Sequence, residues 1–223
     1  MRKKTALAVT ALFAAATLSL SACGTGGAES DQPVADVSAE AQDKAATVLD
    51  RPFEKPDLVL KDTKGKEFDL RERTKGKPVL MYFGYTHCPD VCPLTMSNIA
   101  DAKRRLAQKL PKDELAELQV VFVTTDPERD TPAELGKWLK AQDPSFIGLT
   151  GDFPTIQASA RTLGISIDAP KKEKDGSVTS MHGKQVIAFS PKSDAGYVLY
   201  NGEEATADDY VKDLPKIIKG ENP

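Results

Sequence analysis

Cys88 and Cys92 are the residues best suited to chemistry, because they stand four positions apart in one short segment. Cysteines at this spacing lie on one face of a helical turn, with Cβ atoms roughly 5–6 Å apart. That separation allows either a disulfide bond or the binding of one metal ion by both sulfurs. Pro89 and Pro93 restrict the backbone around the pair. The spacing therefore predicts a dithiol site that is redox-active or metal-binding, with a purely structural disulfide as the alternative.

The dithiol segment follows residues 78–85, a near-continuous apolar run of strand length. Residues 118–125 form a second such run, and continuous rather than alternating hydrophobicity predicts strands that are buried on both faces. Between the two runs, large aliphatic residues recur at loosely helical spacing from Leu94 to Leu110. The two cysteines should therefore open a helix, whose free N–H groups favour thiolates over thiols.

The remaining predicted elements surround these two central strands. Thr131, Pro132 and Glu134 have the pattern of a capped helix start, and glycine-containing loops separate two pairs of strands. The order along the chain is a hairpin, then βαβαβα, then a hairpin and a helix. This order predicts an α/β fold, a thioredoxin-like mixed sheet flanked by helices with an N-terminal β-hairpin extension. The outer elements are expected at residues 58–60, 68–70, 131–142, 146–149, 155–163, 185–190, 197–200 and 206–219.

A third metal ligand would have to come from one of the two histidines in the chain. His87 adjoins Cys88, and adjacent side chains point apart, so we expect His87 to face a partner or to support the site. His182 lies in a polar loop that, in a thioredoxin-like sheet, passes close to the dithiol. Thioredoxins have a cis-proline there, whereas this chain has no proline from residue 171 to 190. Two thiolates and an imidazole suit copper, with zinc the less favoured ion. The alternative for His182 is a surface histidine outside any site.

The first residues have the pattern of an export signal. Basic residues at positions 2–4 precede an uncharged stretch over residues 5–20, which is short for a membrane-spanning helix. The ending Leu20-Ser21-Ala22-Cys23 resembles the lipobox of bacterial lipoproteins, which implies lipidation of Cys23. An ordinary signal peptide with an unmodified cysteine is the alternative. We predict a signal peptide over residues 1–22, a flexible tether over 23–52 and one domain over 53–220, at the extracytoplasmic face of the bacterial cell membrane.

The overall composition excludes several classes of protein. Lys and Arg number 30 against 33 Asp and Glu, so the formal net charge is −3. A nucleic-acid-binding protein would usually be basic, so no nucleic-acid partner is expected. A hydrophobic fraction of 40% with 28% charged residues is typical of a folded globular domain.

Two motifs and the distal histidine resemble the Sco/SenC family, assembly factors for the binuclear copper centre of cytochrome c oxidase. The motifs are Gly84-Tyr85-Thr86-His87-Cys88-Pro89-Asp90-Val91-Cys92-Pro93 and Thr125-Asp126-Pro127-Glu128-Arg129-Asp130-Thr131-Pro132. The resemblance implies that Cys88, Cys92 and His182 bind one copper ion, as Cu(I) or Cu(II). It also implies a membrane-anchored copper chaperone that delivers the ion to cytochrome c oxidase subunit II. Another extracytoplasmic copper chaperone is then the candidate donor.

The second motif and one departure from the family leave roles open. Asp126 and Asp130 follow a central strand and precede a helix, so they either shape the backbone there or support the copper site. Family members commonly carry an aspartate before the histidine, where this chain has Met181. The departure removes a carboxylate from the surroundings of the site and leaves the histidine in place.

Two alternative functions use the dithiol without the histidine. A thiol-disulfide reductase that keeps the target cysteines reduced for metallation would need only Cys88 and Cys92. The missing proline before residue 190 disfavours a general oxidoreductase of this kind. A thiol peroxidase ranks last, because no arginine lies in the first motif. A metallochaperone rather than an enzyme is therefore the leading prediction.

Overall fold

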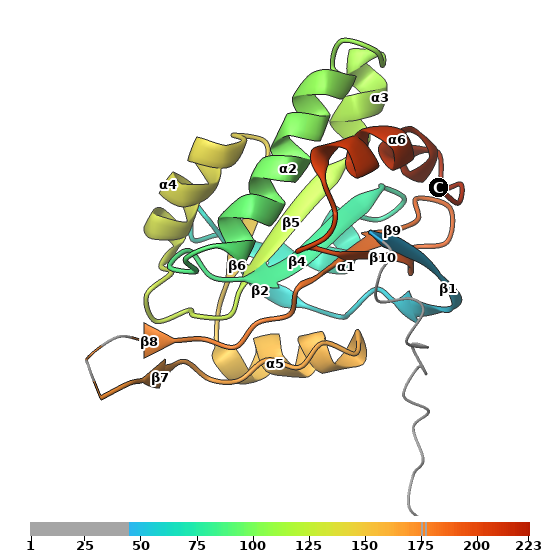
Figure 1. Ribbon diagram of the computed structural model, residues 1–223. Helices are drawn as coiled ribbons and strands as arrows, with labels where there is room; N and C mark the ends of the chain where they lie inside the picture. The colour runs from blue at the N-terminus through green and yellow to red at the C-terminus, as the bar shows by residue number, and fades with distance from the viewer. Residues whose placement is uncertain (1–44, 175, 177) are drawn as a thin grey trace, which may run out of the picture. The chain divides into compact units, whose positions relative to one another are not determined.

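The computed structural model describes residues 45–174, 176 and 178–223, which form one mixed α/β domain (Figure 1). The predicted signal peptide, Cys23 and most of the predicted tether lie outside the described residues. The strands are β1 (Ala46–Glu54), β2 (Val59–Asp62), β3 (Glu67–Asp69), β4 (Val79–Gly84), β5 (Gln119–Thr124), β6 (Ile147–Thr150), β7 (Lys171–Lys172), β8 (Val178–Thr179), β9 (Gln185–Phe189) and β10 (Ala195–Asn201). The helices are α1 (Leu70–Arg73), α2 (Val91–Leu106), α3 (Lys112–Glu117), α4 (Pro132–Gln142), α5 (Phe153–Thr162) and α6 (Ala207–Ile218).

The sheet has eight strands in the order β1-β10-β9-β4-β5-β6-β2-β3. At its centre β4 pairs in parallel with β5 and β5 with β6, whereas β9 pairs antiparallel with β4. Every residue of β4 is buried, which agrees with the continuous apolar run in the sequence. The mixed, thioredoxin-like sheet predicted from the order of elements is thus confirmed.

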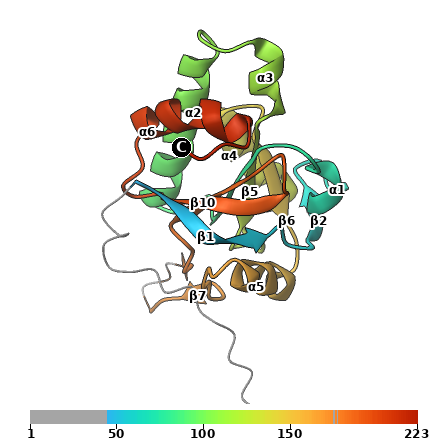
Figure 2. The same ribbon diagram turned by 90° about the vertical axis from the view of Figure 1, so that its right-hand side faces the viewer.

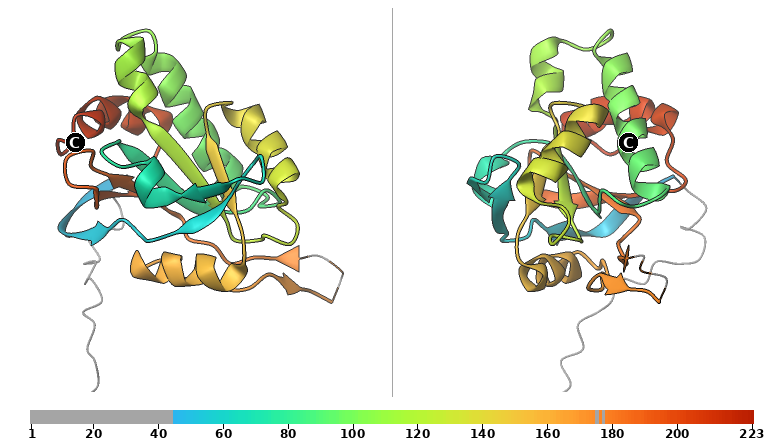
Figure 3. Two further views of the ribbon diagram at one scale, coloured as in Figure 1. Left: turned by 180° about the vertical axis from the view of Figure 1, so that it is seen from behind. Right: turned by 90° about the vertical axis from the view of Figure 1, so that its left-hand side faces the viewer.

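Helices cover both faces of this sheet (Figures 1 and 2). Helices α2, α3, α4 and α6 lie on one face, where their apolar side chains share one buried cluster with Tyr82 and Phe122 of the central strands. Helix α5 lies on the opposite face beside the small β7–β8 hairpin (Figure 3). Its residues Ile156 and Ala160 pack with Phe83 and Val123, whose side chains alternate with those of the first cluster.

The two edges of the sheet are formed by the N-terminal part of the domain. The predicted hairpin is present as β2 and β3, and β2 joins the main sheet by pairing with β6. The other edge is β1, which pairs with β10 from Ala46 onward. The predicted boundary at residue 53 is therefore too late, because residues 46–52 form a strand rather than tether. Their alternation is weak, with Asp50 and Arg51 exposed, so the sequence carried little strand signal.

Local sequence signals explain most of the helix starts. Thr131 accepts a hydrogen bond from the backbone N–H of Glu134 and starts α4, with Pro132 in its first turn. Thr206 and Asp209 form a reciprocal capping box at the start of α6. Pro215 lies within α6. Helix α3 and the β7–β8 hairpin were not predicted, because both are too short for a periodic pattern.

The strand register places two distant loops at one end of the sheet. Tyr82 of β4 pairs with Val186 of β9, and Val186 pairs in turn with Tyr200 of β10, which pairs with Ala46. The end of β4, the start of β9 and the start of β1 therefore share one end of the sheet. Of the helices within the described residues, none is long and apolar enough to cross a membrane.

Candidate metal centre

The dithiol lies where β4 passes into α2. Asp90 starts the helix by accepting a hydrogen bond from the backbone N–H of Val91. The backbone N–H of Cys92 donates to the Sγ atom of Cys88 over 3.4 Å, so a first-turn amide that has no helical partner is satisfied by a sulfur. Cys92 is fully buried and Cys88 retains 7% of its surface. Both are free thiols.

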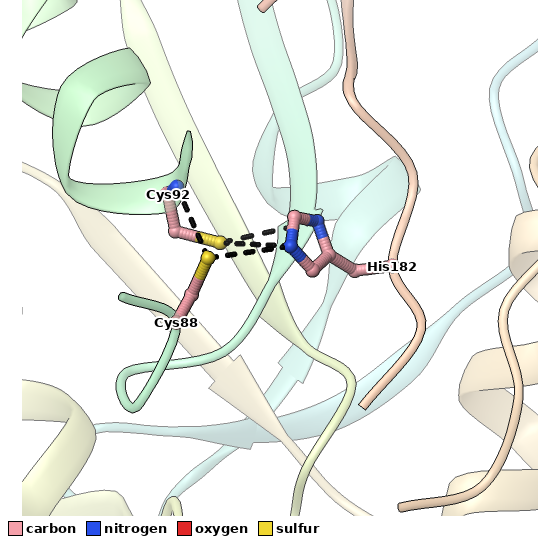
Figure 4. Close-up of side chains that lie close together, drawn as sticks. All are labelled: Cys88, Cys92 and His182. Carbon is pink, nitrogen blue, oxygen red and sulfur yellow. Dashed lines mark hydrogen bonds between the residues drawn. The ribbon is translucent and has the colours of Figure 1, made fainter. Parts of the chain in front are cut away.

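His182 approaches the two sulfurs from the segment that precedes β9 (Figure 4). Its Nε2 atom lies 3.4 Å from Cys88 Sγ and 3.7 Å from Cys92 Sγ. Its Nδ1 atom lies 2.8 Å from the carbonyl oxygen of Gly183. In the neutral imidazole the Nδ1–H group donates a hydrogen bond to this carbonyl, so the lone pair of Nε2 faces the sulfurs. The peptide carbonyl thus selects the tautomer that a metal ligand requires.

The three donor atoms fit a single soft metal ion. One ligand atom from each of Cys88, Cys92 and His182 lies within 4.8 Å of the other two. Bonds of roughly 2.0–2.3 Å to a common ion place the ligand atoms about 3.5–4 Å apart, close to the separations between His182 Nε2 and the sulfurs. Two thiolates and an imidazole form a donor set for copper or zinc rather than for magnesium or calcium.

The two thiols differ in acidity. A hydrogen bond from the Cys92 thiol lowers the pKa of Cys88 to about 4, helped by His182 and against the effect of burial. Burial raises the pKa of Cys92, and the neighbouring Cys88 sulfur raises it further. Burial opposes a charge on His182, but hydrogen bonds to Cys88 and to the Gly183 carbonyl outweigh it and raise its pKa. Cys88 is therefore the thiolate of the metal-free pair.

Comparison with known proteins assigns the chain to a family. The model of the family described as SCO1/SenC matches residues 45–219, nearly the whole described domain. The chain belongs to the SCO1/SenC family.

Individual relatives of this SCO1/SenC chain agree with the assignment. A protein of Stutzerimonas stutzeri that is named for copper binding is 36% identical over 148 residues, 66% of this chain and 70% of its own length. The mitochondrial SCO2 homolog of Mus musculus is 30% identical over 73% of this chain, which spans only 61% of that relative. Among solved structures, Bradyrhizobium japonicum ScoI with copper bound is 30% identical, with a TM-score of 0.61 over 75% of this chain and 98% of its own.

Two tyrosines complete the surroundings of the SCO1/SenC site and were missed in the sequence. The hydroxyl of Tyr82 donates to Cys92 Sγ over 3.4 Å and lies 3.5 Å from Nδ1 of His182. The ring of Tyr85 lies edge-on to the imidazole with centroids 5.3 Å apart. Burial raises the pKa of both phenols, so each remains a neutral hydrogen-bond donor. The available signal was a tyrosine within a fully apolar strand, since a buried hydroxyl needs a partner.

Gly84 makes room for the dithiol at the end of β4. A Cβ atom at this position would lie 2.7 Å from Cys92 Sγ and 2.7 Å from the ring of Tyr82. Both distances are shorter than van der Waals contact, so only glycine allows the sulfur and the phenol to occupy their places. The requirement here is space rather than backbone conformation.

The other residues singled out in the sequence lie around the site rather than in it. His87 is half-exposed, with Nδ1 3.1 Å from the hydroxyl of Thr86 and 3.6 Å from the carboxylate of Asp130. Asp126 is buried and forms an ion pair with Arg129, and Asp130 is fully buried. Met181 is largely exposed. None of these side chains joins the group of donor atoms among the described residues.

Proposed function

We propose that this chain is a copper chaperone that binds one copper ion through Cys88, Cys92 and His182. It delivers the ion to the binuclear copper site of cytochrome c oxidase subunit II. The observation that carries the proposal is the convergence of two sulfurs and one imidazole nitrogen within 4.8 Å. A relative named for copper binding and a copper-bound structure at 30% identity support copper over zinc.

The site residues have the properties that ion uptake and release require. Cys88, with its pKa lowered to about 4, presents a thiolate at neutral pH without first losing a proton. Cys92 is buried with a raised pKa, so its proton leaves only as the metal binds, and uptake releases that proton. Three ligands leave room for an incoming ligand from the acceptor, so transfer proceeds by stepwise ligand exchange. Cys88 and the half-buried His182 are the outward ligands that such an exchange reaches first.

The proposed location follows from the first residues of the chain. Lipidation of Cys23 would hold the domain at the extracytoplasmic face of the bacterial cell membrane, where the acceptor subunit is also expected. A second extracytoplasmic copper chaperone is the proposed donor, because copper ions are handed between soft ligand sets rather than released.

Cells that carry Cys88→Ser, Cys92→Ser or His182→Ala test the proposal through the activity of cytochrome c oxidase. Copper delivery requires all three ligands, so the three variants should lose oxidase activity to a similar extent. His87→Ala is the matched histidine control for copper binding, which it should retain because its ring lies outside the donor group. Full oxidase activity in the His182→Ala cells would contradict copper delivery through this site.

A thiol-disulfide reductase is the second candidate function, favoured by the unequal acidity of the two cysteines. The Cys88 thiolate would attack a disulfide of the target, and Cys92 would then displace the reduced target while the pair forms its own disulfide. Two electrons pass from the dithiol to the target, and an external thiol must reduce the pair again. This reaction does not use His182 as a ligand, so the His182→Ala variant should keep most of its reductase activity.

A further inference from the structure

The loop 124–130, which begins at the last residue of β5, folds back on itself through its own side chains. The hydroxyl of Thr124 donates a hydrogen bond to Oδ2 of Asp130 over 2.6 Å. The same hydroxyl accepts a hydrogen bond from the backbone N–H of Asp126 over 3.0 Å. Asp126 forms an ion pair with Arg129. Thr124, Asp126 and Asp130 are almost completely buried. Burying a charged group costs free energy unless the group is hydrogen-bonded, so the burial of these two carboxylates calls for a structural explanation.

One side of this loop holds the dithiol segment. The carboxylate of Asp130 accepts two hydrogen bonds from Thr86, one from its backbone N–H over 3.0 Å and one from its hydroxyl over 2.5 Å. Thr86 stands two residues before Cys88, and the backbone N–H of Cys88 donates to the carbonyl of Tyr85. The carboxylate thus fixes the turn from which the Cys88 sulfur projects.

The other side of the loop holds the segment that carries the histidine. The hydroxyls of Thr125 and Ser180 lie 3.0 Å apart, and the Ser180 hydroxyl also lies 3.3 Å from the carbonyl oxygen of Thr125. Arg129 donates to the carbonyl oxygen of Val178 over 3.4 Å. Ser180 is buried and stands two residues before His182. These contacts fix the backbone from which the imidazole projects.

We propose that loop 124–130 is a positioning element that sets the separation between the dithiol and His182. This inference rests on the proposed copper site and assigns a role to residues that touch none of its donor atoms. The two ligand-bearing segments come from distant parts of the chain, and this loop contacts both of them. A short, internally bonded loop transmits the position of one segment to the other, as the outer partners of metal ligands do.

The histidine side is tested with Ser180→Ala, which removes both contacts to Thr125. Copper affinity, measured by competition with a copper chelator, should fall about tenfold, the lower end for loss of an outer partner. In a His182→Ala background the same substitution should cause no further loss, because Ser180 acts only through the imidazole. Ser190→Ala is the matched control, since Ser190 is also buried and bonded but follows the far end of β9.

The dithiol side is tested with Thr86→Val. This substitution keeps the shape of the side chain and the backbone N–H, but it removes the hydroxyl that donates to Asp130. Copper affinity should fall about tenfold, and by less in a His182→Ala background, because the contact places the Cys88 turn relative to the imidazole. A single cooperative unfolding transition and an unchanged far-ultraviolet circular dichroism spectrum in each variant show that the fold is retained.

A readout without metal separates this inference from the copper proposal. The chain has two histidines, so the imidazole proton resonances of the metal-free protein are readily assigned by NMR. Ser180→Ala should shift the resonances of His182, which faces the ring of Tyr85, and leave those of His87 in place. Thr86→Val should shift the resonances of both histidines, because the Thr86 hydroxyl contacts His87 and the Cys88 sulfur that follows it lies beside His182.

The possible outcomes decide between the two proposals. Unchanged His182 resonances in the Ser180→Ala protein would overturn the positioning role. For either substitution, an equal loss of copper affinity with and without His182 would also overturn it, because the contact would then act on the whole fold. If wild-type protein bound no copper, the copper proposal would fail, while the NMR shifts would still decide the role of the loop.

Discussion

The Nε2 atom of His182 lies 3.4 Å from the Sγ atom of Cys88, although 94 positions separate the two residues in the chain. The antiparallel pairing of β4 with β9 produces this proximity, because it places the end of one strand beside the start of the other. The dithiol therefore belongs to the first half of the fold and the imidazole to the second. Each can be removed separately, which makes their contributions measurable.

Loss of the imidazole should weaken copper binding far more than loss of the second histidine. His182→Ala removes a ligand, so affinity for copper should fall by at least about 100-fold, beyond the effect of losing an outer partner. His87→Ala should change affinity by less than about threefold. Chelator competition on the two purified variants measures both values. Equal affinities for the two variants would exclude His182 as a ligand.

The metal-free protein should show an unusually acidic cysteine. The pKa of Cys88 is lowered to about 4, so its thiolate persists as the pH falls and is lost only near pH 4. Iodoacetamide should therefore alkylate Cys88 at a nearly constant rate between pH 8 and pH 6. An ordinary cysteine would slow about tenfold per pH unit over that range. Mass spectrometry of the peptide that contains Cys88 measures the rate at this residue alone.

The alkylation profile has its own test of cause. Cys92 supplies the strongest hydrogen bond that stabilises the Cys88 thiolate, so Cys92→Ser should move the midpoint of the profile to higher pH. A profile for the wild-type protein that rises steeply between pH 6 and pH 8 would show that the thiolate is not stabilised.

Tyr82→Phe should retain copper binding but change the electronic character of the site. The variant loses the hydrogen bond from the phenol to Cys92, which strengthens that sulfur as a donor. The thiolate-to-copper absorption band of Cu(II)-loaded protein should move to longer wavelength. The metal-free protein should lose about 1 kcal/mol in its free energy of unfolding.

A second buried tyrosine provides the control for this substitution. The hydroxyl of Tyr210 is buried and has no hydrogen-bond partner among the described residues. Tyr210→Phe should therefore leave both the absorption band and the free energy of unfolding unchanged, or increase the latter slightly. An identical band position in the Tyr82→Phe and wild-type proteins would show that the phenol does not influence the sulfur.

Gly84→Ala should damage the site by filling the space beside the sulfur. The new methyl group would lie 2.7 Å from Cys92 Sγ, so the sulfur or the strand must move. Overpacking of this kind costs about 1–3 kcal/mol in the free energy of unfolding, measured by chemical denaturation. Copper affinity should fall about tenfold. Gly136→Ala, in α4, is the control and should leave copper affinity unchanged.

The proposed lipid anchor is tested with Cys23→Ser. The wild-type protein should partition into the membrane fraction, whereas the variant, without its acyl chains, should be recovered in the soluble fraction. Metabolic labelling with a palmitate analogue checks the modification directly. Labelling that persists in the variant would place the lipid on another residue.

Sequence patterns were sufficient for the elements that carry long apolar or capping signals. The buried strands β4 and β5, the helix cap at Thr131 and the hairpin of β2 and β3 all have strong local signals, and all are present. The proximity of His182 to the dithiol could also be predicted from the sequence, because the order of strands and helices determines which loops share an end of the sheet. The ligand types favoured copper over zinc, and the motif resemblance pointed to the same ion.

The missed features depend on contacts between distant residues. The role of Tyr82 arises only when the start of α2 brings Cys92 against its hydroxyl. The strand β1 forms because β10 offers an unpaired edge, although its own sequence contains exposed charges. The hydrogen bonds that Thr86 donates to Asp130 join two loops, whereas the sequence around Asp130 shows only a helix start. Tertiary pairing decided each of these cases.

The edge strand β1 has a consequence for how the ion meets its acceptor. Ala46 lies in one lateral row with Tyr200, Val186 and Tyr82, so the chain enters the domain three strands, or about 15 Å, from the dithiol. An anchor at Cys23 would hold the domain within reach of the lipid surface. If the proposed acceptor also lies in the membrane, their encounter would be a search in two dimensions, with its rate set by effective concentration.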